Sequence, residues 1–308
     1  MKKIITEGRG SATFFALPWL VAQDEGLFAA EGIEAEFVAP LIGAQARQPV
    51  LQPVVDPGLI DVIRSHSLFE EGSVDVYSAC EWGQIRRALD SKRDGSKILG
   101  KRSCVAVMAL LSAPGSPYTH PQRLRNQPVS VSFHNANHYA ALQMLEGFLE
   151  RDEIKLVCQH HLDGYRSVLN GEVAAIALTE PWLTFAEKQG FQKIIETHYQ
   201  GAEIGAPGLD AETYEAIKRA LRIAVRRITA DKKKYLHYLI SALPEQFRNQ
   251  IGPDDFYLPR IRFVDPEPYG RDEFDKTYQW MVSWNLIRPG VTYESVVVGP
   301  YVSVAEAS

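Results

Sequence analysis

The segments LPWLVAQDEGLF (Leu17–Phe28) and QPVSVSFHNANHYAALQMLEGFL (Gln127–Leu149) share one pattern, and the rest of the chain can be interpreted from them. Each predicts a helix that is entered through a turn at the end of a strand. The first turn of such a helix leaves backbone N–H groups unpaired, and these groups attract an anion together with the helix dipole. Two helix starts that face one another would form a clamp for a negatively charged small molecule.

The residues around the first segment alternate between strand and helix patterns. Strands are predicted at Lys3–Thr6, Ile33–Val38 and Val74–Tyr77, and helices at Phe14–Glu25, Leu59–Glu70 and Glu81–Leu89. This alternation implies parallel strands with helices packed on them.

A second unit of the same kind follows a proline-rich crossing. Its predicted strands are Val129–Phe133, Ile154–Cys158 and Ala174–Leu178, and its predicted helices are Tyr139–Glu150, Tyr165–Asn170 and Trp182–Gln189. The apolar run Cys104–Leu111 is typical of a fully buried strand, and Ile194–Thr197 is interpreted as the return crossing. We therefore predict an α/β fold with two Rossmann-like lobes that are joined by two crossover strands and a hinge.

The predicted first lobe is discontinuous. It comprises residues 1–108 and 198–308, and residues 109–197 form the second lobe, with a ligand cleft between the two. In the C-terminal third, Ala211–Leu243 is predicted to be mostly helical, with a capping aspartate at Asp210. A further helix at Asp272–Leu286 is rich in aromatic residues and is expected to pack back on the first lobe.

Length and composition exclude several classes of protein. The chain has 308 residues, of which 45% are hydrophobic and 23% charged, which suits two compact globular lobes. A net charge of −5 argues against nucleic-acid binding, which calls for a concentrated basic face. The three cysteines, Cys80, Cys104 and Cys158, have no close spacing, so neither a disulfide framework nor a thiolate metal site is indicated.

The N-terminus carries no secretory pattern. Met1 leads directly into a short strand, without the apolar stretch and small-residue cleavage site of a signal peptide. The sequence also lacks an apolar run of the roughly 18 residues that would suggest a membrane span, so no membrane insertion is expected. As given, the sequence predicts a cytoplasmic protein, and a periplasmic one if a leader was trimmed.

Five segments together resemble a known superfamily. They are VAQDEGLFAAEGIEAEFV at Val21–Val38, GSVDV at Gly72–Val76, NHYAAL at Asn137–Leu142, LNGEVAA at Leu169–Ala175 and EPW at Glu180–Trp182. In this order they are similar to the type II periplasmic binding proteins, and most to the branch with sulfonate-, taurine- and nitrate-binding components of ABC importers and thiamine-pyrimidine-synthase-like proteins. The resemblance implies a bilobal fold that closes on a small, usually anionic, organic ligand.

The resemblance does not fix the function, because the same fold serves transport, sensing and catalysis. One related group is a desulfinase whose cysteine nucleophile lies in the turn after the first strand, but the corresponding turn here, Glu7–Thr13, contains no cysteine. The cysteine-rich iron motif of the yeast-type thiamine pyrimidine synthase is also absent. Neither chemistry can be carried over, and no cofactor is predicted.

In a doubly wound sheet the ligand lies beyond the carboxyl ends of the strands, which selects four loops. The predicted ligand-binding residues in these loops are Arg9, Gly10, Ser11, Thr13, Ser78, Glu81, Trp82, His134, Asn135, Asn137, His138, Glu180 and Trp182. Arg9 is either a bidentate partner for a carboxylate or sulfonate or a solvated surface residue. Trp82 and Trp182 follow corresponding strands and could form opposite walls around the ligand.

Several of these residues allow more than one interpretation. Asn135 or Asn137 could cap the following helix, and His134 and His138 could bind ligand, act as general acid or base, or hold zinc. No third metal ligand is placed by sequence, so no metal site is predicted. Cys80 is either a thiol that a helix start activates or a small buried residue. Glu180 could meet a polar group of the ligand or pair with a hinge arginine.

Two functions follow. In the first, the chain is a substrate-binding protein for a small organic sulfonate or carboxylate, with an ABC permease as partner if it is exported. In the second, it is a cytoplasmic hydrolase or lyase, desulfinase-like or decarboxylase-like, that acts on a small aromatic acid. His134, His138, Cys80, Glu180 and His66 would then be its catalytic residues. Binding is favoured, because every recognisable motif serves the fold and none serves a reaction.

Overall fold

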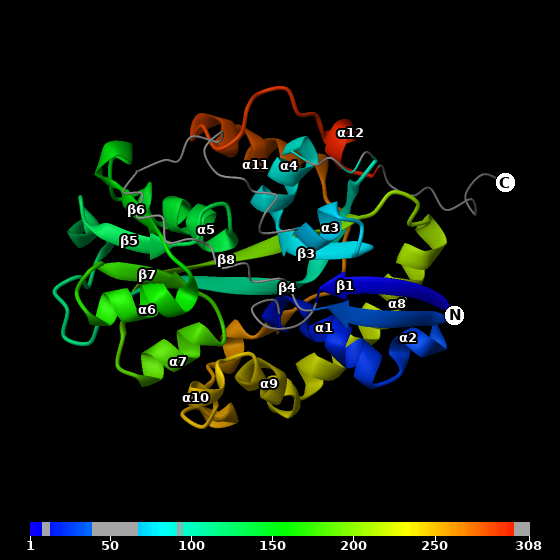
Figure 1. The fold of residues 1–308 in the computed structure, drawn as a ribbon, viewed down its shortest axis with the longest axis horizontal. Helices are drawn as coiled ribbons and strands as arrows, with labels where there is room; N and C mark the ends of the chain where they lie inside the picture. Colours follow the sequence, from blue (N-terminus) through cyan, green and yellow to red (C-terminus); the bar gives the residue numbers. More distant parts are fainter. Residues whose placement is uncertain (8–12, 39–66, 91–92, 94, 299–308) are drawn as a thin grey trace.

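The computed structural model describes residues 1–7, 13–38, 67–90, 93 and 95–298 (Figure 1). The strands are β1 (Lys2–Glu7), β2 (Ile33–Val38), β3 (Val76–Cys80), β4 (Lys97–Ser112), β5 (Pro128–Val131), β6 (Lys155–Cys158), β7 (Ala175–Leu178), β8 (Gln192–Gly205) and β9 (Arg262–Phe263). The helices are α1 (Thr13–Asp24), α2 (Leu27–Ala30), α3 (Ser67–Glu70), α4 (Glu81–Asp90), α5 (Ala136–Leu145), α6 (His161–Leu169), α7 (Trp182–Lys188), α8 (Ala211–Ala230), α9 (Lys232–Ser241), α10 (Glu245–Arg248), α11 (Arg271–Ser283) and α12 (Tyr293–Val296). Short 3-10 turns occur at Pro121–Leu124, Arg151–Glu153, Pro253–Asp255 and Leu258–Arg260.

All the strands belong to one hydrogen-bonded sheet. Its order is β2-β1-β3-β8-β4-β7-β5-β6, and β9 pairs with β4. Within the first unit β1 is parallel to β2 and β3, and within the second β5 is parallel to β6 and β7. β8 runs antiparallel to β3 and β4, and β4 runs antiparallel to β7. The predicted α/β fold, with two Rossmann-like units joined by two crossover strands, is confirmed.

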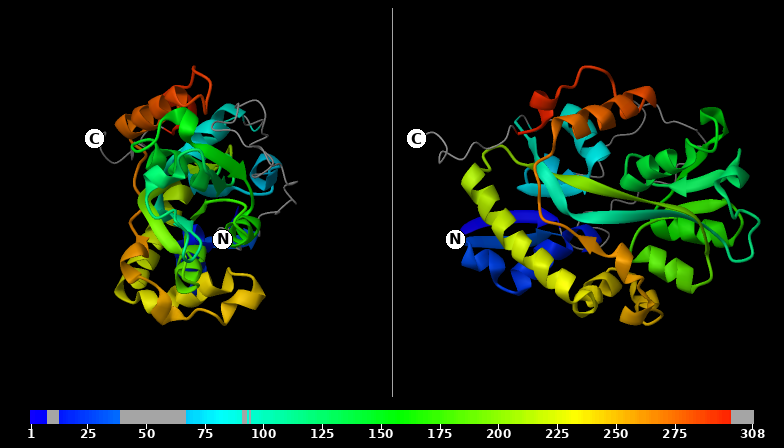
Figure 2. Two further views of the ribbon diagram at one scale, coloured as in Figure 1. Left: turned by 90° about the vertical axis from the view of Figure 1, so that its left-hand side faces the viewer. Right: turned by 180° about the vertical axis from the view of Figure 1, so that it is seen from behind.

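The crossover strands β4 and β8 run through both units (Figure 2). Every residue from Ala106 to Ser112 in β4 is buried, because helices cover both faces of this part of the sheet. Figure 1 shows α4, α5 and α11 on one side of these strands and α1, α6 and α7 on the other. An unbroken apolar run is what such a doubly covered strand requires.

β4 does not stay in register with β8 along its whole length. A shift between Lys101 and Val105 leaves the residues between them without a β8 partner. Cys104 pairs with β9 instead, and Val105 pairs with both β8 and β9. A bulge of this kind redirects the side chains that it contains. It places Arg102 in the interior of the protein.

The predicted helix Ala211–Leu243 is interrupted. Asp210 caps α8 by accepting a hydrogen bond from the backbone N–H of Thr213, as expected. α8 ends at Ala230, and Asp231 caps a new helix, α9, through the N–H of Lys234. An aspartate that competes for backbone N–H groups explains the break. Of the predicted helix Leu59–Glu70, only Ser67–Glu70 lies within the described residues, as α3.

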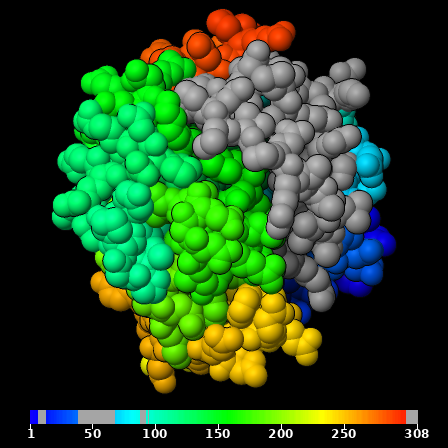
Figure 3. Space-filling model, turned by 60° about the vertical axis from the view of Figure 1, so that its left-hand side comes forward, coloured from blue at the N-terminus to red at the C-terminus, as the bar shows by residue number. Residues whose placement is uncertain are grey.

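The C-terminal third contacts both units of the sheet. Trp280 of α11 has its ring 6.3 Å from that of Trp82 in α4, and its indole N–H donates to Glu146 after α5. On the other face, Phe247 of α10 packs against Trp182 and Phe185 of α7. In Figure 3 the yellow and orange surface of this segment adjoins the green surface of the second unit. The division into residues 1–108 with 198–308 and 109–197 stays a prediction.

Candidate functional site

Part of the predicted site lies outside the described residues. Arg9, Gly10 and Ser11 do so, and so does His66. Thr13 begins α1 and is buried. The described candidates therefore come from the ends of β3, β5 and β7 and from the crossover strands.

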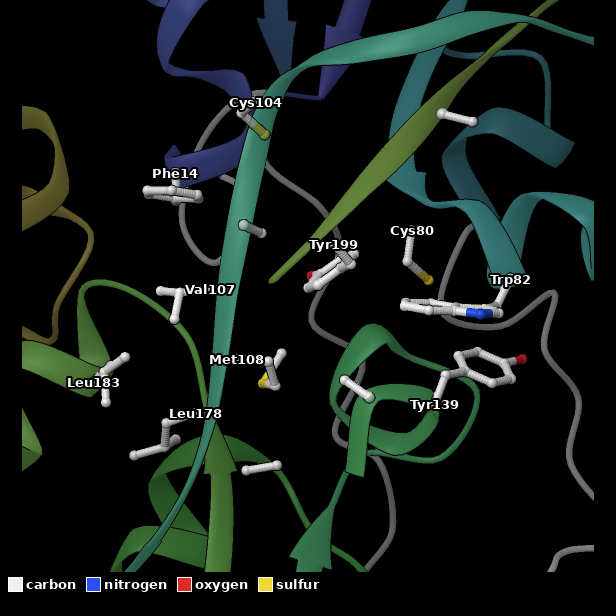
Figure 4. Packing of buried hydrophobic residues seen from close by; sticks show 14 of the residues in the cluster. Phe14, Cys80, Trp82, Cys104, Val107, Met108, Tyr139, Leu178, Leu183 and Tyr199 are labelled. Carbon is white, nitrogen blue, oxygen red and sulfur yellow. The ribbon is translucent and has the colours of Figure 1, made fainter. Parts of the chain in front are cut away.

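Trp82, in the first turn of α4, joins the two units. Its ring stacks on Tyr139 of α5 at 5.7 Å and lies 5.2 Å from the ring of Tyr199 in β8. Figure 4 shows these residues together with Cys80 on one side of β4. The Trp82 side chain is buried, and its Nε1–H has no acceptor among the described residues. Trp82 thus brings an unused donor to the contact between the units.

The turn between β5 and α5 is held by its own side chains. His134 adopts the left-handed backbone conformation, with a φ of 60°. Asn137 Oδ1 accepts from the backbone N–H of Ser132 at 3.1 Å, and His138 Nδ1 accepts from the N–H of His134 at 3.1 Å. Asn135 occupies the N-cap position but makes no side-chain capping bond. Asn135 thus stands at the predicted N-cap position without the capping hydrogen bond, and the side chain of Asn137 closes the preceding turn instead.

The protonation of His138 follows from this geometry. Burial lowers the pKa of His138 to about 3, assisted by the charge of Arg86, so its imidazole is neutral near pH 7. Because Nδ1 accepts a hydrogen bond, the single ring proton resides on Nε2. His138 Nε2 is buried and has no partner among the described residues. His138 is therefore a second buried N–H donor without an acceptor.

His134 is neutral for the same reason. Burial and the neighbouring His138 lower the pKa of His134 to about 2, and its Nδ1 lies 3.3 Å from the hydroxyl of Tyr139. The sequence predicted histidines that titrate near neutrality and could act as general acid or base, and the structure contradicts this for both. A group of three or more side chains suited to a metal ion is not found in the described part of the chain.

Cys80 is a buried thiol at the end of β3. Burial raises the pKa of Cys80 to about 11, so the thiol stays protonated at neutral pH. Activation by the start of α4 does not offset this desolvation, and the interpretation as a small buried residue is the one that the structure supports.

Glu81, the neighbour of Cys80, accepts a hydrogen bond from the hydroxyl of Tyr269 at 2.9 Å, and burial raises the pKa of Glu81 to about 7. The hydroxyl of Ser78 is buried without a partner in the described residues.

Glu180, at the end of β7, pairs with an arginine from the C-terminal third. Its Oε2 accepts from the backbone N–H of Thr184 at 3.1 Å, and its Oε1 lies 3.6 Å from Nε of Arg260. Arg260 also donates to Glu187 at 2.5 Å. Of the two interpretations of Glu180, pairing with an arginine is the one that the structure supports.

Trp182 lies in a different aromatic cluster from Trp82. Its ring contacts Tyr165, Phe185 and Phe247 at 5.9, 5.8 and 5.8 Å. Within the described residues no ring contact joins Trp182 to Trp82, and the expectation that the two form opposite walls around a ligand stays a prediction. α10 explains the difference, because its Phe247 packs against the Trp182 ring.

Three contributors were not found from the sequence. Tyr139 and Tyr199 supply rings next to Trp82, and Arg102 places a buried guanidinium next to Tyr199. Arg102 and Tyr199 belong to the crossover strands, whereas the sequence argument considered only loops after strands. A polar residue at the start of the apolar run Cys104–Leu111 was the only local signal for Arg102.

Comparison with known proteins gives matches among solved structures. No family model matches the sequence, and no curated protein matches it either. Several solved structures do share the fold. The periplasmic aliphatic sulphonate binding protein SsuA from Escherichia coli is 13% identical with a TM-score of 0.70, covering 97% of this chain and 92% of that chain.

Two further structures show that the fold is shared beyond importers. The Candida albicans CA3427 gene product, described as having the generic periplasmic binding protein structural fold, is 12% identical with a TM-score of 0.67, over 97% of this chain and 96% of that one. The desulfurization enzyme DSZB is 14% identical with a TM-score of 0.60, over 96% of each chain. At these identities the likeness concerns architecture. The chain therefore has the type II periplasmic binding protein fold that the five sequence segments predicted.

Proposed function

We propose that the protein binds a small organic anion of the sulfonate or carboxylate class where the two units of the sheet meet. The observation that carries this proposal is a pair of buried N–H donors without acceptors, Trp82 Nε1 and His138 Nε2. Trp82 comes from the first unit and His138 from the second, and the ring of Tyr139 contacts both, at 5.7 and 5.2 Å.

Donors of this kind call for an acceptor. A buried N–H group that loses its hydrogen bond to water and finds no other costs about 1–3 kcal/mol. The oxygens of a carboxylate or sulfonate accept several hydrogen bonds each and would satisfy both groups at once. His138 lies in the first turn of α5, where backbone N–H groups and the helix dipole favour the same negative charge. These features support an oxyanion over a neutral or cationic ligand.

Binding is better supported than catalysis. A nucleophilic cysteine must be a thiolate, and burial keeps Cys80 protonated. The two histidines at the site are neutral and poor proton acceptors, because burial lowers the pKa of each well below neutrality. The alternative function is that of a hydrolase or lyase on the same scaffold. The structural similarity to the desulfurization enzyme DSZB is the reason to test it.

The proposed cycle is closure of the two units over the anion. β4 and β8 connect the units and would act as the hinge, and closure would exclude water and strengthen the polar contacts. If the protein is exported, its partner would be an ABC permease, and if it remains in the cytoplasm it would act alone. Among the described residues there is no helix of the length and apolarity needed to cross a membrane.

A ligand panel tests the proposal. Thermal unfolding would be measured with methanesulfonate, benzenesulfonate, benzenesulfinate and benzoate, with benzyltrimethylammonium as the cationic control. We expect at least one of the anions to raise the unfolding temperature and the cation to have no effect. Mass spectrometry of the recovered ligand separates the two functions, because a bound ligand returns unchanged and a substrate is consumed. Equal shifts with anions and cation would refute anion binding.

A further inference from the structure

Arg102 is a buried cation with an unusual environment. Its side chain is 1% exposed and lies in the bulge of β4, opposite Gly201 of β8. The guanidinium carbon lies 4.2 Å from the centre of the Phe15 ring and 5.2 Å from that of Tyr199. Phe15 belongs to the first turn of α1, so Arg102 sits beside the helix start at which the sequence pattern predicts an anion.

None of the guanidinium nitrogens of Arg102 makes a hydrogen bond of good geometry in the described part of the chain, and the neutral hydroxyl of Tyr199 is a polar group that interacts with it. The carboxyl group of Glu203, on which the charge of Arg102 acts, already accepts from the Trp19 indole at 3.0 Å and from the Tyr214 hydroxyl at 3.1 Å. Burial also raises the pKa of Glu203 to about 7, so this carboxyl carries little charge below that pH. Arg102 keeps its proton at all relevant pH values and has no hydrogen-bonded counter-charge among the described residues.

The surroundings are shaped to hold a flat cation. A Cβ at position 201 would lie 2.6 Å from Cζ and Nε of Arg102, so the guanidinium rests directly on the glycine backbone. The rings of Phe15 and Tyr199 exclude water from its vicinity. The hydroxyl of Tyr199 is also buried, and burial raises the pKa of Tyr199 although the neighbouring Arg102 opposes this, so the hydroxyl stays neutral beside the guanidinium. The group is thus rich in donors and poor in acceptors.

A buried charge without a partner is among the most unfavourable features that a fold can retain. A planar fork of N–H donors matches the oxygens of a carboxylate or sulfonate in a bidentate arrangement. We propose that Arg102 is the binding residue for the charged group of the ligand, a carboxylate, sulfinate or sulfonate.

This inference rests on the proposed function and extends it. The ring of Tyr199 lies 5.2 Å from both Arg102 and Trp82, so the donors fall into two neighbouring groups. Arg102 would take the charged group, and Trp82 with His138 would bind further acceptor oxygens of the same molecule. A compact anion with several oxygens is the ligand class that suits both groups.

The test compares two buried arginines. Arg102→Met removes a charge that has no ion-pair partner among the described residues, whereas Arg260→Met removes one that is paired with Glu187 and Glu180. Without ligand, we expect Arg102→Met to unfold at the same temperature as the wild type or higher, and Arg260→Met to unfold at a lower one. With the anion that stabilises the wild type best, isothermal titration should show a roughly 10- to 100-fold loss of affinity in Arg102→Met only.

The outcomes separate this inference from the proposed function. If no anion binds the wild type, both the proposed function and the assignment of Arg102 are refuted. If an anion binds the wild type and Arg102→Met within twofold of each other, only the assignment of Arg102 is overturned. Arg102→Lys, which keeps the charge but loses the fork, should bind with intermediate affinity. A fall in unfolding temperature for Arg102→Met as large as that for Arg260→Met would identify a structural residue and also overturn the assignment.

Discussion

The indole ring of Trp82 lies 5.7 Å from the phenol ring of Tyr139 at an angle of 25°. This stacked pair joins the first turn of α4 in one unit to the first turn of α5 in the other. The site therefore depends on how the two units are placed, and not on either unit by itself.

Trp82→Phe should weaken anion binding. The substitution keeps an aromatic ring next to Tyr139 and removes a buried N–H that has no acceptor in the described residues. We expect a loss of roughly 2- to 10-fold in anion affinity, measured by isothermal titration, because one hydrogen bond to the ligand disappears. Trp284→Phe is the matched control. The Trp284 indole donates to Glu146 at 2.7 Å, and among the described residues its ring makes no contact with the ring of Tyr139. A Trp82→Phe variant with wild-type affinity would contradict the role of this donor.

His138 should make the protein less stable in mild acid. Its pKa is lowered from 6.5 to about 3, so between these values the unfolded chain binds a proton that the folded chain does not. Stability is therefore present above about pH 6.5 and falls as the pH drops towards 3, by up to about 1.4 kcal/mol per pH unit. The free energy of unfolding, measured with urea between pH 5 and 7.5, should fall less steeply with decreasing pH in His138→Phe than in the wild type. The exposed His237→Gln variant serves as control, and a slope unchanged by His138→Phe would argue against this assignment.

Gly201 should not tolerate a side chain. A Cβ there would lie 1.9 Å from the carbonyl oxygen of Ala79 and 2.6 Å from the guanidinium of Arg102. Overpacking of this kind typically lowers the free energy of unfolding by about 1–3 kcal/mol. For Gly201→Ala we expect the upper end of this range or more, because the methyl group would meet backbone atoms. Gly147→Ala is the control, because a Cβ at Gly147 would meet no atom within 4 Å. Circular dichroism during thermal unfolding measures both, and equal unfolding temperatures would show that the two strands can separate to admit the methyl group.

Glu146 should hold α11 against the second unit. Its Oε1 and Oε2 lie 3.1 and 2.9 Å from the indole nitrogen of Trp280, and Oε2 also accepts from Trp284 at 2.7 Å. Glu146→Ala removes these acceptors and should lower the free energy of unfolding by roughly 1–2 kcal/mol, while Glu146→Gln, which keeps one acceptor, should lower it less. Hydrogen exchange should increase in α11 in the alanine variant. Unchanged exchange there would mean that other contacts hold the helix.

Local patterns in the sequence were sufficient for much of the described secondary structure and for the repeated β-α-β order along the chain, although β9, α10 and α12 were not predicted. The alternation at Ile33–Val38 predicts β2 with its observed ends, and the apolar run Cys104–Leu111 lies within β4. Such patterns are reliable because they record which faces of an element are buried, and neighbouring residues in one element share that burial. The repeated β-α-β order then leaves few ways to arrange the sheet.

The contacts between distant segments were decided by the tertiary structure. Trp82 and Trp182 occupy similar places in their units, yet their neighbours differ. Tyr199 of the crossover strand β8 packs against Trp82, and Phe247 of α10 packs against Trp182. The neutrality of His134 and His138 and the protonation of Cys80 also result from burial by remote elements. Arg102 is buried because β4 loses register with β8, and no local pattern marks that shift. The sequence by itself determined the fold, because hydrophobic periodicity is local. The groups that remain without partners inside the protein depend on every element packed around them, so only the folded chain reveals them.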